Sequence, residues 1–255
     1  MIRLYSHQRH PSPQDFKRRC AIGHTLQTSL WVAGSILVYV AAAHLLRALE
    51  KRPDSSVARF VRQAESTGAN WIIRLLYYAG VPYMAVMLGA ADFPAHLGLA
   101  RLDWPASGGR GAILGIAVFA ALAGIAWYSV RSLRQMGSVT PAPPHARPAW
   151  MAALDAFLLE AHWAFYRLPG ILMTGDLLLG TAIGAGLAIL ERAADPRWRR
   201  AASSQVWLET WLDLALLVGM AVAFYFTRNF FVLWAIHAAL DAGIRKMTQW
   251  LLERA

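Results

Sequence analysis

The chain has 255 residues, of which 57% are hydrophobic and only 16% are charged. Soluble domains carry about a quarter charged residues, so this composition excludes an ordinary soluble protein. The net charge of +10 would suit nucleic-acid binding in a soluble protein. Here, however, the basic residues lie between apolar runs, where Lys and Arg set topology and meet anionic lipid headgroups. We therefore predict the lipid bilayer as a partner and no nucleic acid.

From the N-terminus, residues 1–24 form a predicted basic arm, which carries five Lys or Arg residues before the first apolar run. That run is too long for a signal-peptide core, so it is predicted to remain as a membrane span. Residues 25–255 are predicted to form a single all-α transmembrane domain, a polytopic helical bundle of about seven spans. These spans cover approximately residues 25–49, 70–90, 112–133, 149–169, 176–192, 206–226 and 229–252.

Proline and glycine predict the breaks in this pattern. Pro82 is expected to kink the second span. Residues 92–111 and 137–148 are rich in Pro or Gly and are predicted to be connections outside the membrane. The fourth span is expected to end at Pro169 and Gly170.

Two compositional features predict packing and origin. Gly180, Gly184 and Gly186 in the fifth span give it a small-residue face, which is typical of closely packed membrane helices. Arg outnumbers Lys by 22 to 3 in the whole chain, which favours a GC-rich bacterial genome. The predicted location is the bacterial cytoplasmic membrane.

Ionisable residues inside apolar spans are costly and usually have a partner in the bundle interior. His237 and Asp241 are four residues apart in the last span, so they share one helical face. The fourth span holds the largest group of such residues, namely Asp155, Glu160, His162, Tyr166 and Arg167. Glu160 and Arg167 are two turns apart on one face. These residues predict either a polar site opposite His237 and Asp241 or a network that holds the helices together.

The segment TRNFFVLWAIHAALD, from Thr227 to Asp241, resembles the third motif of the CPBP family, the CAAX protease and bacteriocin-processing intramembrane proteases. That motif has a histidine, three residues, and then Asn or Asp. The segment HWAFYR, residues 162–167, lies where the family carries its first motif of two glutamates, three residues and an arginine. The resemblance implies a CPBP-like core in the C-terminal half of the chain.

The resemblance also implies a catalytic site. In the family a glutamate activates water, and histidines with Asn or Asp stabilise the oxyanion or bind a metal. The residues implied here are Glu160, His162, Arg167, His237 and Asp241. Alignment on Arg167 places His162 and Trp163 at the two glutamate positions, and Glu160 is rotated from the first by about 200° on a 3.6-residue helix.

Three functions remain open at this point. The first is a degenerate family member that serves as a scaffolding, binding or assembly factor in the membrane. The second is an active intramembrane endopeptidase that uses a variant Glu, His and Asp site. The third is an accessory subunit of a larger bioenergetic membrane complex, in contact with other membrane-protein subunits.

The sequence assigns no cofactor or metal. His162, His237 and Asp241 are residue types that suit zinc. A histidine could also ligate a haem or chlorophyll-type pigment, although the chain has only Cys20 and therefore no haem-attachment motif.

Overall fold

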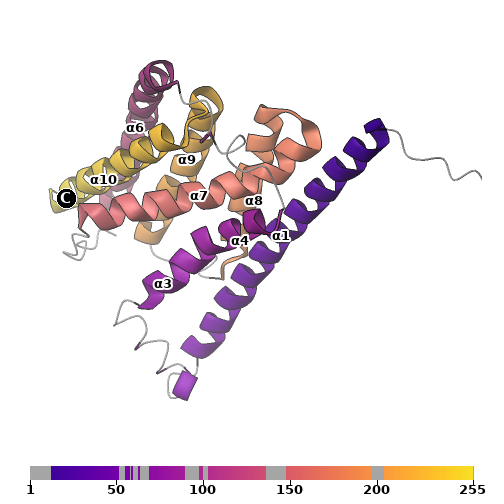
Figure 1. Cartoon of the computed structure of the whole chain (residues 1–255). Helices are drawn as coiled ribbons and strands as arrows, with labels where there is room; N and C mark the ends of the chain where they lie inside the picture. The colour runs from indigo at the N-terminus through magenta and orange to yellow at the C-terminus, as the bar shows by residue number, and fades with distance from the viewer. Residues whose placement is uncertain are drawn as a thin grey trace, which may run out of the picture.

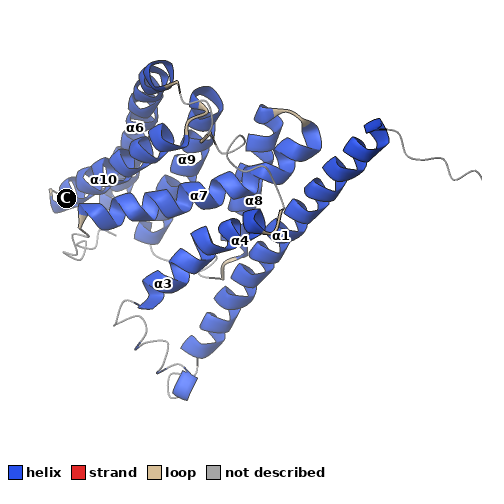
Figure 2. Ribbon diagram, in the orientation of Figure 1, coloured by secondary structure: helices blue, strands red, loops and turns tan. Residues whose placement is uncertain are grey.

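The computed structural model describes residues 13–51, 69–89, 103–135, 148–196 and 204–254, together with positions 55–57, 59, 63, 98 and 99. All the regular elements in these ranges are helices, and none of the described residues lies in a strand (Figure 2). The all-α prediction is therefore confirmed. The elements are α1 (Pro13–Glu50), α3 (Ala69–Leu75), the π-helix η1 (Leu76–Gly80), α4 (Val81–Met87), α6 (Trp104–Gln135), α7 (Ala149–Thr174), α8 (Leu177–Ala194), α9 (Ser204–Thr227) and α10 (Phe230–Glu253).

Four segments are long and apolar enough to cross a membrane: Ile22–Leu49, Trp104–Gln135, Leu177–Ala194 and Leu208–Thr227. A shorter apolar segment covers Trp71–Met87. These helices indicate a membrane-embedded, multi-pass protein. When α3, η1 and α4 are taken as one interrupted rod, the described residues form seven helical rods, and the crossing of the membrane by the remaining rods stays a prediction.

Several helices are longer than their predicted spans. The first helix, α1, begins at Pro13, inside the predicted N-terminal arm, and residues 1–12 lie outside the described part. At the start of α6, Trp104 and Pro105 belong to a stretch that was predicted to be a connection. Proline is tolerated in the first turn because its missing N–H has no intrahelical partner there. The predicted connection at 137–148 lies outside the described residues except for Pro148.

The fourth predicted span continues past its expected end. Helix α7 includes Pro169 and Gly170 and ends at Thr174. Gly175 then has a φ of 67° and donates its N–H to the carbonyl of Ile171, which terminates the helix. A left-handed residue after the last turn is a common way to end a helix. The proline was therefore the wrong stop signal.

The predicted irregularity in the second span lies just before Pro82. Leu76 to Gly80 form a π-helix, and α4 begins at Val81 with Pro82 as its second residue. A π-helical turn leaves room where a proline cannot donate an N–H, and such turns are often found at functional sites. This turn carries Tyr77 toward the centre of the bundle.

Helix α7 occupies the middle of the bundle (Figure 1). It packs against α8, α10, α1 and η1. One apolar core surrounds it, with Phe165, Tyr166, Phe224 and Leu233 among its most buried members. A second core joins α6, α9 and α10. Polar residues on α7 are therefore placed among four other helical segments.

Two of the three predicted packing glycines bring α8 against α7. A Cβ on Gly184 would lie 2.7 Å from the backbone N of Arg167. A Cβ on Gly180 would lie 2.6 Å from the backbone N of Ile171. Gly186 faces open space, with nothing within 4 Å of such a Cβ. The small-residue face is therefore confirmed for Gly180 and Gly184 and wrong for Gly186.

Candidate functional site

Glu160 on α7 and His237 on α10 form a buried pair at the centre of the molecule. Oε1 of Glu160 lies 2.8 Å from Nδ1 of His237, and the two side chains are 0% and 2% exposed. The indole of Trp163 stacks on the imidazole, with ring centroids 5.2 Å apart and planes inclined by 13°. This aromatic cover and the burial of both partners leave the pair almost no accessible surface.

A second imidazole–carboxylate pair joins α7 to α8. Nε2 of His162 on α7 lies 3.1 Å from Oε2 of Glu191 on α8. The hydroxyl of Tyr77 donates to the other oxygen, Oε1 of Glu191, at 2.8 Å. It also lies 3.3 Å from the hydroxyl of Tyr166 and within hydrogen-bond distance of Ser35 on α1. One network therefore joins four helices.

Arg167 and Glu160 share a face of α7, but no ion pair joins them among the described residues. Its guanidinium carbon lies 3.8 Å from the centroid of the Phe224 ring on α9, and the residue is 3% exposed. Nε and Nη2 of Arg167 have no hydrogen-bond partner among the described residues. Oε2 of Glu160 also has none. Arg167 therefore contacts α9 through a cation–π interaction, and not Glu160 along α7.

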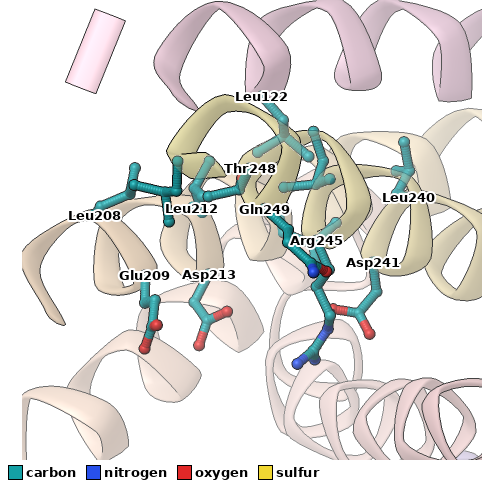
Figure 3. Close-up of a pocket in the computed structure, with 13 residues that line it drawn as sticks. Leu122, Leu208, Glu209, Leu212, Asp213, Leu240, Asp241, Arg245, Thr248 and Gln249 are labelled. Carbon is teal, nitrogen blue, oxygen red and sulfur yellow. The ribbon is translucent and has the colours of Figure 1, made fainter. Parts of the chain in front are cut away.

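Asp241 lies apart from His237, although the two share a helix face. Its Oδ1 accepts hydrogen bonds at 2.8 Å from Arg245, four residues further along α10. Asp241 lines a cavity of about 330 Å³ between α9, α10 and α6 (Figure 3). The carboxylates of Glu209 and Asp213, both on α9, lie on the same side of this cavity as that of Asp241. Of the five residues implied by the resemblance, only Glu160 and His237 are brought together directly.

Beside the His162–Glu191 pair lies a second cavity of about 290 Å³, which we call the α8–α9 cavity. Its charged and polar lining residues are His162, Glu191, Arg192, Asp195, Thr210 and Asp213. The aromatic rings of Tyr39, Tyr78 and Trp163 also line it. Asp213 is shared with the cavity that contains Asp241.

The zinc alternative does not match this geometry. His162 and His237 each pair with a different glutamate, and Asp241 pairs with Arg245. No group of three or more His, Cys, Asp or Glu residues suited to holding a metal ion is found in the described part of the chain.

Sequence reasoning missed two members of these networks, Glu191 and Tyr77. Glu191 was not singled out, although an acidic residue near the end of a glycine-rich apolar span is the same kind of costly charge as Glu160. Tyr77 and Arg74 lie in the second predicted span, where such residues are typical of an interfacial aromatic belt with a basic anchor. The structure instead places Tyr77 on Glu191, and Arg74 3.1 Å from Asp155 of α7. Tertiary partners of this kind leave no trace in residue spacing along one helix.

Comparison with known protein families, characterised proteins and solved structures finds no match for this chain. The site is therefore interpreted from its own geometry. An imidazole–carboxylate pair can hold and transfer a proton, but a general base must also reach the water that it activates. Glu160 and His237 lie within hydrogen-bond distance of each other, but their burial keeps water and substrate away from both side chains.

Proposed function

We propose that this chain is a multi-pass protein of the bacterial cytoplasmic membrane, related to the CPBP intramembrane proteases and carrying a degenerate, non-hydrolytic site. In this proposal it serves as a binding, scaffolding or assembly factor, including as an accessory subunit of a larger membrane complex. The supporting observation is the closed Glu160–His237 pair. These two residues, which the resemblance assigns to hydrolysis, are hydrogen-bonded to each other and are 0% and 2% exposed.

The geometry around this pair supports a structural use of the same residues. Asp241, which the resemblance also implies in hydrolysis, contacts Arg245 and not His237. The pair joins α7 to α10, and the His162–Glu191 pair joins α7 to α8. Because hydrogen bonds between buried groups fix the register of membrane helices, these pairs would give the bundle one defined shape. A defined shape is what a scaffold requires.

The test compares peptide cleavage with assembly. The purified full-length protein in lipid nanodiscs is incubated with transmembrane and prenylated peptide substrates, alongside the His237→Ala variant. We expect no cleavage above background with either protein. Native gel electrophoresis of the solubilised membrane should show the chain in a discrete complex larger than the monomer. Cleavage by the wild type that His237→Ala abolishes would overturn the proposal.

One observation favours an endopeptidase as the second candidate. The 2.8 Å separation of Glu160 Oε1 and His237 Nδ1 is within the reach that a base and its partner need. Oε2 of Glu160 lacks a partner among the described residues and is the atom on which water would bind. This function requires α7 and α10 to separate enough to admit water and substrate. Cleavage lost in both Glu160→Gln and His237→Ala would identify it.

A further inference from the structure

A groove of about 440 Å³ separates α1 from the rod formed by α3, η1 and α4, which runs in the opposite direction (Figure 1). We call it the α1–α3 groove. Its walls are chiefly apolar and include Val38 and Leu46 of α1 and Ile73 of α3. Val38 and Ile73 are each 61% exposed, so both walls face the surroundings of the bundle. The volume is within the range of sites that bind small molecules, about 300–1,000 Å³.

The α1–α3 groove covers the depth of one membrane leaflet. Along α1 its lining extends from Val38 to Leu46, which is about 12 Å of helix at 1.5 Å per residue. The apolar segment of α1 is Ile22–Leu49, so Val38 lies near the middle of this segment and Leu46 near its end. Half of a hydrocarbon core of about 30 Å is about 15 Å. An acyl chain in the groove therefore reaches from one membrane surface to the bilayer centre. A transmembrane helix, about 10 Å wide and 30 Å long, does not fit in this volume.

Basic residues gather where the groove meets the membrane surface. Arg74 belongs to the lining and lies near the start of the apolar segment Trp71–Met87. Residues 47–52, RALEKR, follow the groove along the chain and carry three basic residues and one acidic residue. Arg47 is one helical turn beyond the lining residue Ala43 and is therefore on the same face of α1. Basic residues at this depth attract anionic lipid headgroups.

Two carboxylates near the groove already have partners. Asp155 lies 3.1 Å from Nη1 of Arg74, and the Arg74 side chain is still 32% exposed. Because a guanidinium has five N–H donors, Arg74 can contact Asp155 and a phosphate at the same time. Asp195 accepts a hydrogen bond from the hydroxyl of Tyr39 at 3.0 Å. Tyr39 is at the deep end of the groove, about 12 Å along α1 from Arg47.

Contacts between helices fix the width of the groove at its deep end. The hydroxyl of Tyr77 in η1 donates to the carbonyl of Ser35 in α1. The rings of Tyr39 and Tyr77 also face each other across the groove, with centroids 5.8 Å apart. The groove therefore keeps its shape without an occupant, and such preorganisation reduces the entropic cost of binding.

We propose that the α1–α3 groove holds one acyl chain of an anionic glycerophospholipid, whose phosphate is bound by Arg74 and Arg47. A zwitterionic lipid offers the same chain and phosphate, but its ammonium group is repelled by the basic end of α1. The inference goes beyond the proposed function and does not depend on it, because neither Glu160 nor His237 lines the groove.

The first test compares two lipids on the wild-type protein. Native mass spectrometry of the full-length chain, released from detergent micelles, measures the binding of phosphatidylglycerol and of phosphatidylcholine with the same acyl chains. We expect one phosphatidylglycerol molecule to bind at least about fivefold more tightly, since each basic residue near a membrane surface raises the affinity for anionic lipid by about this factor. Equal affinity for the two lipids would overturn the proposal. A dimer without bound phosphatidylglycerol would also overturn it and would place a second copy of the chain on this face.

The second test changes the charge at the end of the groove. Arg47→Gln removes one cation and should weaken phosphatidylglycerol binding by about fivefold, with phosphatidylcholine binding unchanged. Arg110→Gln is the matched control, because Arg110 is an exposed arginine of α6 that does not line the groove. Unchanged phosphatidylglycerol binding in Arg47→Gln, or a loss of the same size in Arg110→Gln, would contradict the assignment of the headgroup.

The third test fills the groove. Val38→Trp adds a large ring at an exposed position in the wall, so the protein should fold normally and lose the tightly bound phosphatidylglycerol molecule. Ile116→Trp is the control, since Ile116 is 71% exposed on α6 and lies outside the groove. Retention of this lipid in Val38→Trp, or its loss in both variants, would show that the acyl chain is not held in the α1–α3 groove.

Discussion

Nδ1 of His237 lies 2.8 Å from Oε1 of Glu160, and both side chains are sealed within the bundle. The contact joins α10 to α7, two helices that are far apart in the sequence. It places the histidine of the protease-like third motif on a glutamate two residues upstream of the aligned first motif. The pair thus closes the region in which the resemblance predicts an active site.

Removal of Glu160 should destabilise the protein strongly. Glu160→Ala leaves the imidazole of His237 buried without a partner, which should lower the free energy of unfolding by about 3 kcal/mol. Glu160→Gln keeps the shape and one hydrogen bond, so its loss should be about 1 kcal/mol. Denaturant titration of the protein in micelles measures both. Equal stability of Glu160→Ala and the wild type would show that the pair contributes nothing to the fold.

The partner of His237 can be identified by a double-mutant cycle. His237 and Glu160 are in direct contact, so His237→Ala and Glu160→Ala should show an interaction energy of at least about 1 kcal/mol. His237 and Asp241 contact different groups, so the corresponding cycle with Asp241→Ala should give less than about 0.5 kcal/mol. Larger coupling to Asp241 than to Glu160 would restore the pairing that the sequence suggests.

Local sequence patterns predicted the helices better than their partners. The apolar run and the glycines of the fifth span predicted α8 within two residues at each end. Asp176 accepts a hydrogen bond from the N–H of Leu179 and so caps this helix, as a residue of its type at that position should. The expected helix end at Pro169 was wrong because α7 packs against other helices both before and after this proline. The helix tolerates the one backbone hydrogen bond that Pro169 cannot donate.

The candidate site could be predicted only in part for the same reason. Glu160, His162 and His237 stand out in the sequence because a charge inside an apolar span needs a partner. Their true partners depend on how α7, α8 and α10 cross, and helical spacing carries no information about that. Asp241 was grouped with His237 by the i, i+4 rule, which Arg245 satisfies equally well from the other side.

The contact between α7 and α8 can be tested at two glycines of one helix. Gly184→Ala would place a methyl group against the backbone of Arg167, so it should lower the free energy of unfolding by about 2 kcal/mol. Gly186→Ala meets open space and should raise it by up to about 1 kcal/mol, because alanine suits a helix better than glycine. Thermal unfolding of both variants in the same lipid measures these two changes in stability. Destabilisation of equal size at the two positions would contradict the packing described for α8.

The hydroxyl of Tyr77 should stabilise the bundle through Glu191. Tyr77→Phe keeps the ring but removes a donor 2.8 Å from a carboxylate that is 6% exposed. Because hydrogen bonds to charged groups contribute about 1.5–3 kcal/mol, the free energy of unfolding should fall by roughly this amount. Tyr83→Phe is the control, since the Tyr83 side chain is 61% exposed and the change should stay within about 0.5 kcal/mol. The same variant also tests the position of the second pair, because Glu191 would keep its hydrogen bond with His162 and lose the one from η1. A neutral Tyr77→Phe substitution would mean that Glu191 does not depend on the π-helical turn for its placement.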